Sequence, residues 1–318
     1  MPAMTLRVQD AQSEADLIRG IELVAEDASP LPPFTPGAHV EVTLPDGDTR
    51  PYSLVDFDGS CAAPRSYRFG VRLEDDSAGG SRFMHGLAAG DTVTVSEPVN
   101  DFPLAEDGAP SLLLAGGIGV TPIISMAAAL RAAGRDYRFV YAARSRPALA
   151  FGERLAAEHG DRLTVHIDDE VGGPLDVGGT IAAAPAGAHL YVCGPRPMID
   201  AAREAAEQAG FGPERIHFEL FESAAQAEGD TAFEVELASS GQVFTIPPGR
   251  TIIEVLEEAG IDLIHDCQRG DCGICQTDVL EGEPDHRDVV LSDAERAAGN
   301  VMQICVSRAK SARLKLDL

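Results

Sequence analysis

The chain has 318 residues, a length that predicts two or three domains. Hydrophobic residues make up 44% of it and charged residues 24%, which are values of a globular protein and argue against a disordered one. Its 51 acidic and 25 basic side chains give a formal net charge of −26. That charge is repelled by phosphate groups, so it disfavours nucleic-acid binding and membrane-surface functions.

The sequence predicts no segment for export or membrane anchorage. The first 22 residues carry six charged side chains and lack the apolar core of a signal peptide. Residues 112–130 are uncharged over nineteen positions, a length that suggests a membrane span. Three glycines and a proline in their centre, however, predict a short strand, a turn and the start of a helix. We therefore expect a cytoplasmic protein.

Short β-strands are predicted in the first hundred residues. Apolar and polar side chains alternate in residues 38–45, 66–74 and 91–97, and Gly, Pro and Asp residues separate these runs. Several short alternating strands are typical of a small antiparallel barrel. We expect this barrel to occupy residues 1–107.

From about residue 110 the pattern changes to alternating strands and helices. Apolar runs at 111–115, 137–143, 163–167, 189–193 and 216–221 are separated by Ala-rich helical stretches at 122–133, 148–159 and 197–209. This alternation predicts an α/β domain with a mostly parallel sheet, at residues 108–222.

A third domain is predicted at the C-terminal end, after a small, polar linker at residues 223–230. Apolar residues alternate around Val235 and again around Val243, with Gly241 between them, which predicts a β-hairpin. A short helix is expected at residues 251–259. We assign residues 231–318 to this domain.

Four of the six cysteines lie in this last domain, at positions 267, 272, 275 and 305. The spacing C-x4-C-x2-C followed by a distant cysteine is that of plant-type [2Fe–2S] clusters, in which four thiolates bind two irons. Gly270 and Gly273 allow the loop to curl around such a cluster. A zinc site would more often show two C-x2-C pairs, and unbound thiols are the third alternative. We predict Cys267, Cys272, Cys275 and Cys305 as cluster ligands.

The sequence around these cysteines resembles a known family. Residues 266–275 (DCQRGDCGIC) resemble the cluster loop of plant-type ferredoxins. Residues 283–288 and 305–311 resemble the C-terminal ferredoxin domain of phthalate dioxygenase reductase-type proteins, which include vanillate O-demethylase reductases. The resemblance implies a β-grasp ferredoxin domain. The residue before the first cysteine is usually Ser, and Asp266 at that position is expected to disfavour reduction of an already anionic cluster.

Residues 50–54 (RPYSL) resemble the flavin motif of the same family. There the Arg50 guanidinium would pair with the flavin phosphate, Tyr52 would lie against the flavin ring, and Ser53 would hydrogen-bond near its reactive nitrogen. Residues 70–72 resemble the strand beside the flavin, and 79–81 the phosphate-binding turn. An ordinary barrel strand and a plain surface loop are the alternatives. We predict FMN as the flavin, and the further flavin-binding residues are Val71, Gly79, Gly80 and Ser81.

Two stretches of the α/β domain resemble the nicotinamide-nucleotide motifs of ferredoxin-reductase-like proteins. Residues 116–122 (GGIGVTP) lie between a strand and a helix, where backbone amides and the helix dipole favour a pyrophosphate. Residues 193–198 (CGPRPM) follow the strand at 189–193, and Cys193 would lie near the nicotinamide. A tight turn without ligand, and a buried core thiol at Cys193, are the alternatives. The predicted nucleotide-binding residues are Gly116, Gly117, Gly119, Thr121, Pro122, Cys193, Gly194 and Pro195.

Other residues are assigned from their place after a strand. Arg144 and Arg146 follow the strand at 137–143, where a 2′-phosphate would bind if NADPH were used. The resemblance favours NADH. Glu219 and Phe221 lie where the family places groups near the flavin, although Phe221 would also suit a core. We predict catalytic roles for Ser53, Cys193 and Glu219.

The motifs together predict an oxidoreductase that takes electrons from NADH through FMN and a [2Fe–2S] cluster to a partner protein. The family implies that this partner is a Rieske-type aromatic hydroxylase or demethylase. Three alternatives remain open: a cytochrome P450 as the partner, an electron-carrier subunit that does not itself oxidise NAD(P)H, and a zinc-stapled binding module.

Overall fold

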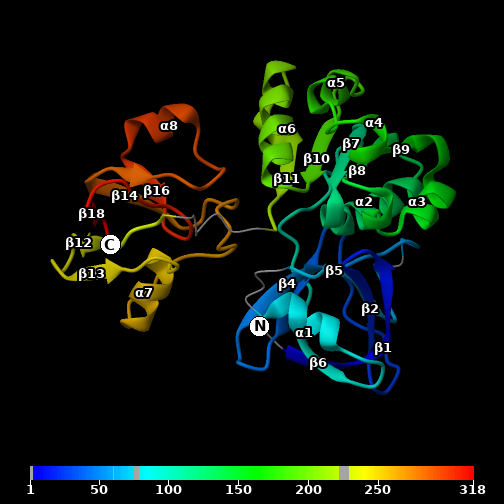
Figure 1. Cartoon of the computed structure of the whole chain (residues 1–318), viewed down its shortest axis with the longest axis horizontal. Helices are drawn as coiled ribbons and strands as arrows, with labels where there is room; N and C mark the ends of the chain where they lie inside the picture. Colours follow the sequence, from blue (N-terminus) through cyan, green and yellow to red (C-terminus); the bar gives the residue numbers. More distant parts are fainter. Residues whose placement is uncertain (1–2, 60, 75–78, 222–228) are drawn as a thin grey trace. The chain divides into compact units, whose positions relative to one another are not determined.

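The computed structural model describes residues 3–59, 61–74, 79–221 and 229–318 (Figure 1). The chain divides into two compact units, unit 1 at residues 1–219 and unit 2 at residues 220–318. No helix in the described ranges is long and apolar enough to cross a membrane. The predicted linker at 223–230 falls largely on residues 222–228, which lie outside the described residues.

The N-terminal half of unit 1 is a six-stranded antiparallel sheet with the order β4-β3-β6-β1-β2-β5. End strands β4 and β5 lie near each other, as the predicted barrel requires. Alternate residues of β3 and β6 are buried in its core, among them Val40, Val42, Val93 and Val95. The elements are β1 (Ala3–Ala15), β2 (Ile18–Val24), β3 (His39–Thr43), β4 (Thr49–Ser53), β5 (Tyr67–Arg72), α1 (Gly80–Gly86) and β6 (Thr92–Ser96).

The two longest strands of this sheet, β1 and β2, were not among the predicted elements. In β1 only Leu6 and Val8 are buried, so its thirteen residues show no sustained alternation. The pairing of β1 with both β2 and β6 holds it in place instead. Strand signals based on alternation therefore miss it.

The second half of unit 1 is a parallel sheet with the order β11-β10-β7-β8-β9, which confirms the predicted α/β part. Both β7 and β10 are buried along their whole length, as expected for central strands covered on both faces. Figure 1 shows α6 on one side of the sheet and α2 and α3 on the other. The elements are β7 (Ser111–Gly116), η1 (Gly117–Gly119), α2 (Val120–Ala132), β8 (Tyr137–Ala143), η2 (Arg146–Ala148), α3 (Gly152–His159), η3 (Gly160–Arg162), β9 (Leu163–Ile167), α4 (Asp168–Val171), α5 (Val177–Ala182), β10 (His189–Cys193), α6 (Arg196–Gln208), η4 (Pro213–Arg215) and β11 (Ile216–Glu219).

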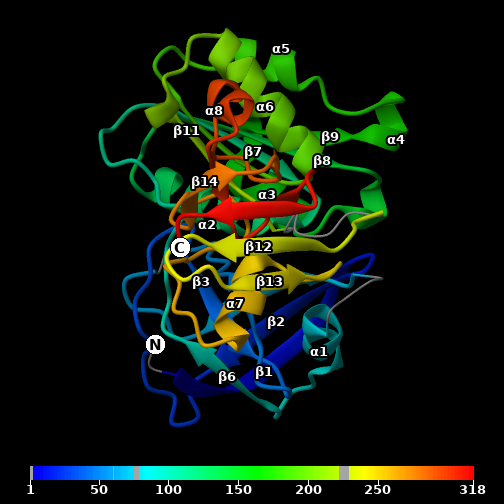
Figure 2. The ribbon, with the colours of Figure 1, turned by 90° about the vertical axis from the view of Figure 1, so that its left-hand side faces the viewer.

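Unit 2 has a mixed five-stranded sheet with the order β13-β12-β18-β14-β16, in which β12 and β18 are parallel (Figure 2). Helix α7 packs on this sheet through Ile252, Ile253 and Leu256. Its N-terminus carries a capping box between Thr251 and Glu254. The elements are β12 (Phe233–Leu237), β13 (Val243–Ile246), α7 (Ile252–Glu258), β14 (Gln276–Glu281), β15 (Pro284–Asp285), α8 (Asp293–Ala298), β16 (Val301–Gln303), β17 (Arg308–Ala309) and β18 (Arg313–Leu316).

Candidate functional site

Two glycine loops meet at the carboxyl edge of the parallel sheet. A Cβ added to Gly119 would collide with the backbone carbonyl of Cys193. A Cβ on Gly194 would lie 3.0 Å from the backbone nitrogen of Gly116. The loops after β7 and β10 therefore pack backbone against backbone, and only glycine fits where they touch. The structure brings together the two predicted nucleotide motifs at the edge where open α/β sheets bind ligands.

Helix α2 begins directly after the first of these loops. Its first residue is Val120, and the Thr121 hydroxyl donates a hydrogen bond of 3.0 Å to the carbonyl of Ile118. Pro122 is buried within the first turn, where a missing amide hydrogen costs nothing. The helix dipole at this point favours an anionic group such as a pyrophosphate.

Two further predicted residues end the neighbouring strands. Cys193 is fully buried at the end of β10 and pairs in register with Ala115 on one side and Glu219 on the other. Glu219 is buried at the end of β11. Phe221 is 40% exposed and belongs to unit 2. Cys193 and Glu219 thus lie side by side at the sheet edge, and Phe221 lies beyond that edge in the chain.

The predicted flavin-phosphate residues also come together. A Cβ on Gly80 would lie 2.8 Å from Cγ of Arg50 and 3.0 Å from the Tyr52 hydroxyl. The Arg50 guanidinium bonds Asp48 at 2.6 Å and is partly exposed. The Ser81 hydroxyl accepts a hydrogen bond of 3.1 Å from the Glu74 amide. The structure thus brings a guanidinium, a hydroxyl and the start of α1 to one place, groups whose chemistry suits a phosphate.

The stretch 79–81 is the beginning of a helix and not the turn that the sequence indicated. Gly79 has a φ of 102°, a conformation that favours glycine, and α1 starts at Gly80. Residues 75–78 before it lie outside the described ranges.

The remaining predicted flavin residues lie on the two end strands of the barrel sheet. Ser53 is buried at the end of β4, and Tyr52 packs edge-on against Phe69 at 6.4 Å between ring centroids. Burial raises the pKa of Tyr52 to about 12, so its phenol stays neutral. The carbonyl of Val71 in β5 is hydrogen-bonded to His85 at 2.8 Å. Their positions are compatible with a flavin ring between β4 and β5.

The flavin strand β5 lies directly against the nucleotide motif. A Cβ on Gly70 would be 2.9 Å from the methyl group of Thr121 and 3.0 Å from the ring of Phe151. This close approach is within unit 1. The structure therefore places the two predicted binding motifs next to each other, which a reaction between a nicotinamide and a flavin requires.

The two arginines considered for a 2′-phosphate differ in their surroundings. Arg144 is exposed after β8. Arg146 forms a bidentate pair with Glu170 of α4, with Nε–Oε1 at 2.7 Å and Nη2–Oε2 at 2.6 Å. This pairing lowers the pKa of Glu170 and raises that of Arg146, so both stay charged. A carboxylate occupies the guanidinium fork of Arg146 and would compete with a phosphate for it.

A cavity of about 930 Å³ in unit 1 was not predicted from the sequence. It lies between β1, β2 and β5 of the barrel sheet and the α3–α4 side of the parallel sheet. Its lining includes Phe57, Arg68, Arg146, Phe151 and Arg154. These residues come from separate segments without a shared motif, and only Arg146 was singled out by its place after a strand.

The four clustered cysteines of unit 2 contact one another. The Cys305 thiol hydrogen-bonds with Cys267 and Cys275, which holds the pKa of Cys267 at about 3 and lowers that of Cys275. Desolvation raises the pKa of Cys272 to about 11, and its sulfur contacts Cys267. Within the described ranges no group of three or more His, Cys, Asp or Glu is arranged to hold a metal ion. The four thiols instead contact one another through Cys267 and Cys305, and four thiols are the donor set that a two-iron cluster needs.

The loop that carries these cysteines curls as predicted. Gly270 and Gly273 have φ values of 82° and 79°, and a Cβ on Gly270 would lie 2.6 Å from Val306. The Arg269 amide donates to the Cys267 sulfur at 3.3 Å. Cys275 and Cys305 are buried, Cys267 is half-buried and Cys272 is exposed. Such a loop supplies an amide hydrogen to a sulfur and leaves the Cys272 thiol at the surface.

Comparisons with known proteins agree with a nucleotide-binding domain in unit 1 and an iron–sulfur domain in unit 2. Residues 113–204 match the model of the oxidoreductase NAD-binding domain, and residues 235–310 match that of the 2Fe-2S iron-sulfur cluster binding domain. The chain is 42% identical to phenoxybenzoate dioxygenase subunit beta from Ectopseudomonas oleovorans, over 100% of this chain and 98% of the relative.

Two solved structures are similar over nearly the whole chain. Phthalate dioxygenase reductase, described as a modular structure for electron transfer from pyridine nucleotides to [2Fe–2S], is 36% identical with a TM-score of 0.78, over 99% of this chain and 98% of that one. An intact type IV self-sufficient cytochrome P450 monooxygenase is 38% identical with a TM-score of 0.70, over 99% of this chain and 41% of the larger protein.

Proposed function

Since the chain belongs to the phthalate dioxygenase reductase-type family of iron–sulfur flavoprotein reductases, we propose that it oxidises NADH and delivers the electrons to a partner oxygenase. Its resident cofactors are FMN and a [2Fe–2S] cluster. The packing of the two glycine loops beside β5 carries this proposal, because it sets a nucleotide site against a flavin site. The protein is an oxidoreductase, and we place it in the cytoplasm, where its cysteines stay reduced.

The proposed domains are a flavin barrel at 1–107, a nucleotide domain at 108–222, a linker at 223–230 and a ferredoxin domain at 231–318. Asp230, at the end of the linker, bonds Arg287 at 2.8 Å and pairs with Arg308 at 3.5 Å. This buried ion pair supports a start of the ferredoxin domain close to residue 230.

The residues of unit 1 bind and orient NADH beside the flavin. The amides after Gly116 and at the start of α2 hold the pyrophosphate, and the Cys193–Glu219 edge receives the nicotinamide. Arg50, Gly80 and Ser81 hold the FMN phosphate, and Ser53 donates a hydrogen bond to the ring. When bound, FMN accepts two electrons at once and releases them singly.

The residues of unit 2 hold the cluster and leave one side of it open. Cys267, Cys272, Cys275 and Cys305 are its ligands. Because Cys272 is the exposed member of this set, we propose that electrons leave toward the partner on its side of the loop.

The visible spectrum and the cofactor content of the purified full chain test this function. We expect a brown protein that bleaches when NADH is added without oxygen and that releases FMN on denaturation. A yellow protein without iron–sulfur absorbance would contradict the cluster. A coloured protein that NADH and NADPH leave unchanged would favour an electron-carrier subunit. A colourless protein would favour the zinc-stapled module.

A cytochrome P450 is the second candidate for the partner. It is favoured by the likeness of the whole chain to part of a self-sufficient P450 monooxygenase. Reconstitution with each class of oxygenase distinguishes the two, because only the acceptor differs.

A further inference from the structure

The segment that follows the flavin motif leaves the barrel and joins the core of the parallel sheet. Val55 and Phe57 are 4% and 3% exposed, and both belong to the apolar cluster formed by α2 and the parallel strands. A Cβ on Gly59 would lie 3.5 Å from Ala132, near the end of α2. Residues 54–59 thus run along α2, the helix that begins at the nucleotide motif.

One buried hydroxyl joins this segment to α2. Ser125 is fully buried, and its hydroxyl donates a hydrogen bond of 2.6 Å to the carbonyl of Leu54. The same oxygen accepts a hydrogen bond of 2.9 Å from the amide of Asp56. Leu54 is the last residue of the flavin motif, and Ser125 lies one helical turn beyond Thr121 of the nucleotide motif. The hydroxyl therefore ties the end of the flavin motif to the helix that begins at the nucleotide motif.

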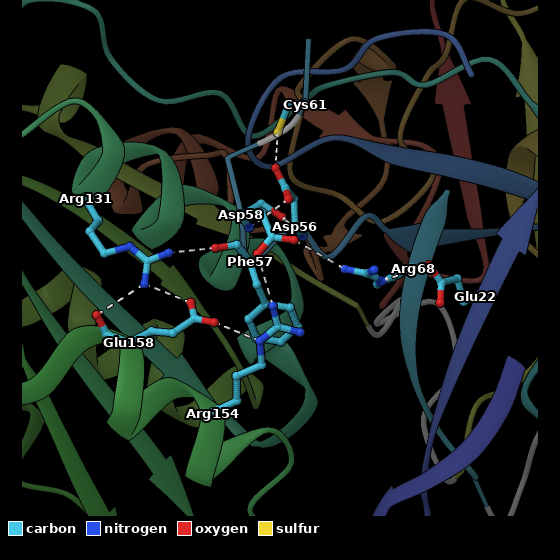
Figure 3. A network of polar contacts seen from close by, with 10 residues as sticks. Glu22, Asp56, Phe57, Asp58, Cys61, Arg68, Arg131, Arg154 and Glu158 are labelled. Carbon is cyan, nitrogen blue, oxygen red and sulfur yellow. Dashed lines mark hydrogen bonds and ion pairs between the residues drawn. The ribbon is translucent and has the colours of Figure 1, made fainter. Parts of the chain in front are cut away.

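Charged side chains extend this connection along the helix (Figure 3). Arg131, near the end of α2, donates to the Phe57 carbonyl at 2.8 Å and to Glu158 at 2.9 Å. Arg154 lies over the Phe57 ring at 3.7 Å and pairs with Asp58 at 3.3 Å. We call residues 54–58 with Ser125, Arg131, Arg154 and Glu158 the interdomain clamp. It fixes the segment at two points of α2 and leaves little freedom for α2 to move relative to β4.

We propose that Ser125 is a positioning residue for the transfer of electrons from NADH to the flavin. In that step NADH loses two electrons and a proton and becomes NAD⁺, and the flavin gains them, so the outcome depends on near-contact between the two rings. The rings are held by motifs on either side of the Ser125 hydroxyl. The clamp would set the separation of these motifs within unit 1, and so act on the rings through the motifs that hold them. This inference rests on the proposed function.

One substitution, compared with a control, distinguishes a positioning role of Ser125 from a purely structural one. Ser125→Ala removes the hydroxyl and leaves the Leu54 carbonyl and the Asp56 amide without their partner. Ser111→Ala is the matched control, because Ser111 is equally buried but lies at the first residue of β7, at the opposite end of the sheet. Arg131→Gln is a milder second variant, because Arg131 is half-buried.

The experiment uses the full chain with both cofactors and measures the rate of flavin reduction by saturating NADH, per bound flavin. We expect about a ten-fold slower reduction in Ser125→Ala and a smaller loss in Arg131→Gln. The rate of flavin reduction in Ser111→Ala should stay within two-fold of the rate in the unaltered chain. The dissociation constant for NADH should stay within two-fold of the unaltered chain in every variant. Reduction by dithionite, which needs no docked nucleotide, should not change.

A second readout does not depend on activity. Amide hydrogen exchange at residues 54–58 should be faster in Ser125→Ala, while the amides of β7 and β10 keep their protection. An unchanged reduction rate with a loosened segment would overturn the proposal. A loss of activity that is fully explained by a loss of bound flavin would also overturn the proposal, because Ser125 would then act on flavin binding and not on positioning. If the unaltered chain is not reduced by NADH, the proposed function fails instead.

Discussion

The nucleotide edge of unit 1 and the cysteine loop of unit 2 build their sites in different ways. The edge is made of backbone: Gly116, Gly119 and Gly194 allow two loops to touch, and backbone amides are the proposed binding groups. The loop is made of side chains, because four thiols are the predicted ligands. A side-chain site is recognisable from the spacing of a reactive residue type, whereas a backbone site needs its strand and helix as context.

Loss of one ligand should have the largest effect and should be confined to unit 2. In Cys272→Ser the cluster is lost, and we expect cytochrome c reduction to fall at least about a hundred-fold. NADH should still reduce the flavin, measured with ferricyanide as the acceptor. Cys61→Ser is the control, because a hydroxyl there can still donate to Asp56. Equal loss of both activities in Cys272→Ser would contradict the separation of the two sites.

A methyl group at the backbone site should be nearly as damaging. Gly119→Ala forces a Cβ into the Cys193 carbonyl, so the two loops must separate. We expect the dissociation constant of NADH to rise about a hundred-fold, with the FMN content unchanged. Gly134→Asn is the control, because it lies at the end of the same helix in open space. Normal NADH binding in Gly119→Ala would show that the contact is not part of the site.

Removal of a surface carboxylate should shift nucleotide preference modestly. In Glu170→Gln the fork of Arg146 is no longer paired with a negative charge, so a 2′-phosphate can approach it. Because the pair is exposed, we expect kcat/KM for NADPH to rise only about two- to five-fold, with the value for NADH unchanged. Asp176→Asn, which alters a helix cap elsewhere, serves as the control. If kcat/KM for NADPH does not change in Glu170→Gln, Arg146 is not part of the nucleotide-binding site.

Raising the salt concentration should have the smallest effect on turnover, and it should act by screening the charge of unit 2. Residues 231–318 contain 16 acidic and 8 basic side chains, a net charge of −8. All eight basic side chains pair with a carboxylate of the same unit, so the excess charge is acidic. We therefore expect the KM for cytochrome c, a basic protein, to rise with ionic strength. Salt-insensitive turnover would argue against an acidic docking face around the cluster.

The sequence predicted most of the parallel sheet, because largely apolar runs alternate with helical stretches there. It did not predict β1, in which only Leu6 and Val8 are buried, or its neighbour β2, or the helical start at Gly80. The spacing of the four cysteines predicted an iron–sulfur domain, and the match of residues 235–310 to the 2Fe-2S domain model confirms that domain. The contacts of Gly70 with Thr121 and of Ser125 with Leu54 join residues about fifty and seventy positions apart, and no local pattern encodes such pairs.

An anaerobic titration of the full chain with NADH tests the central claim most directly. FMN takes two electrons and a [2Fe–2S] cluster takes one, so complete bleaching should need about 1.5 equivalents of NADH per protein. The flavin and iron–sulfur absorbances should both disappear in the same titration. An endpoint at about one equivalent, with the iron–sulfur absorbance unchanged, would show that electrons do not pass from the nucleotide site to the cluster.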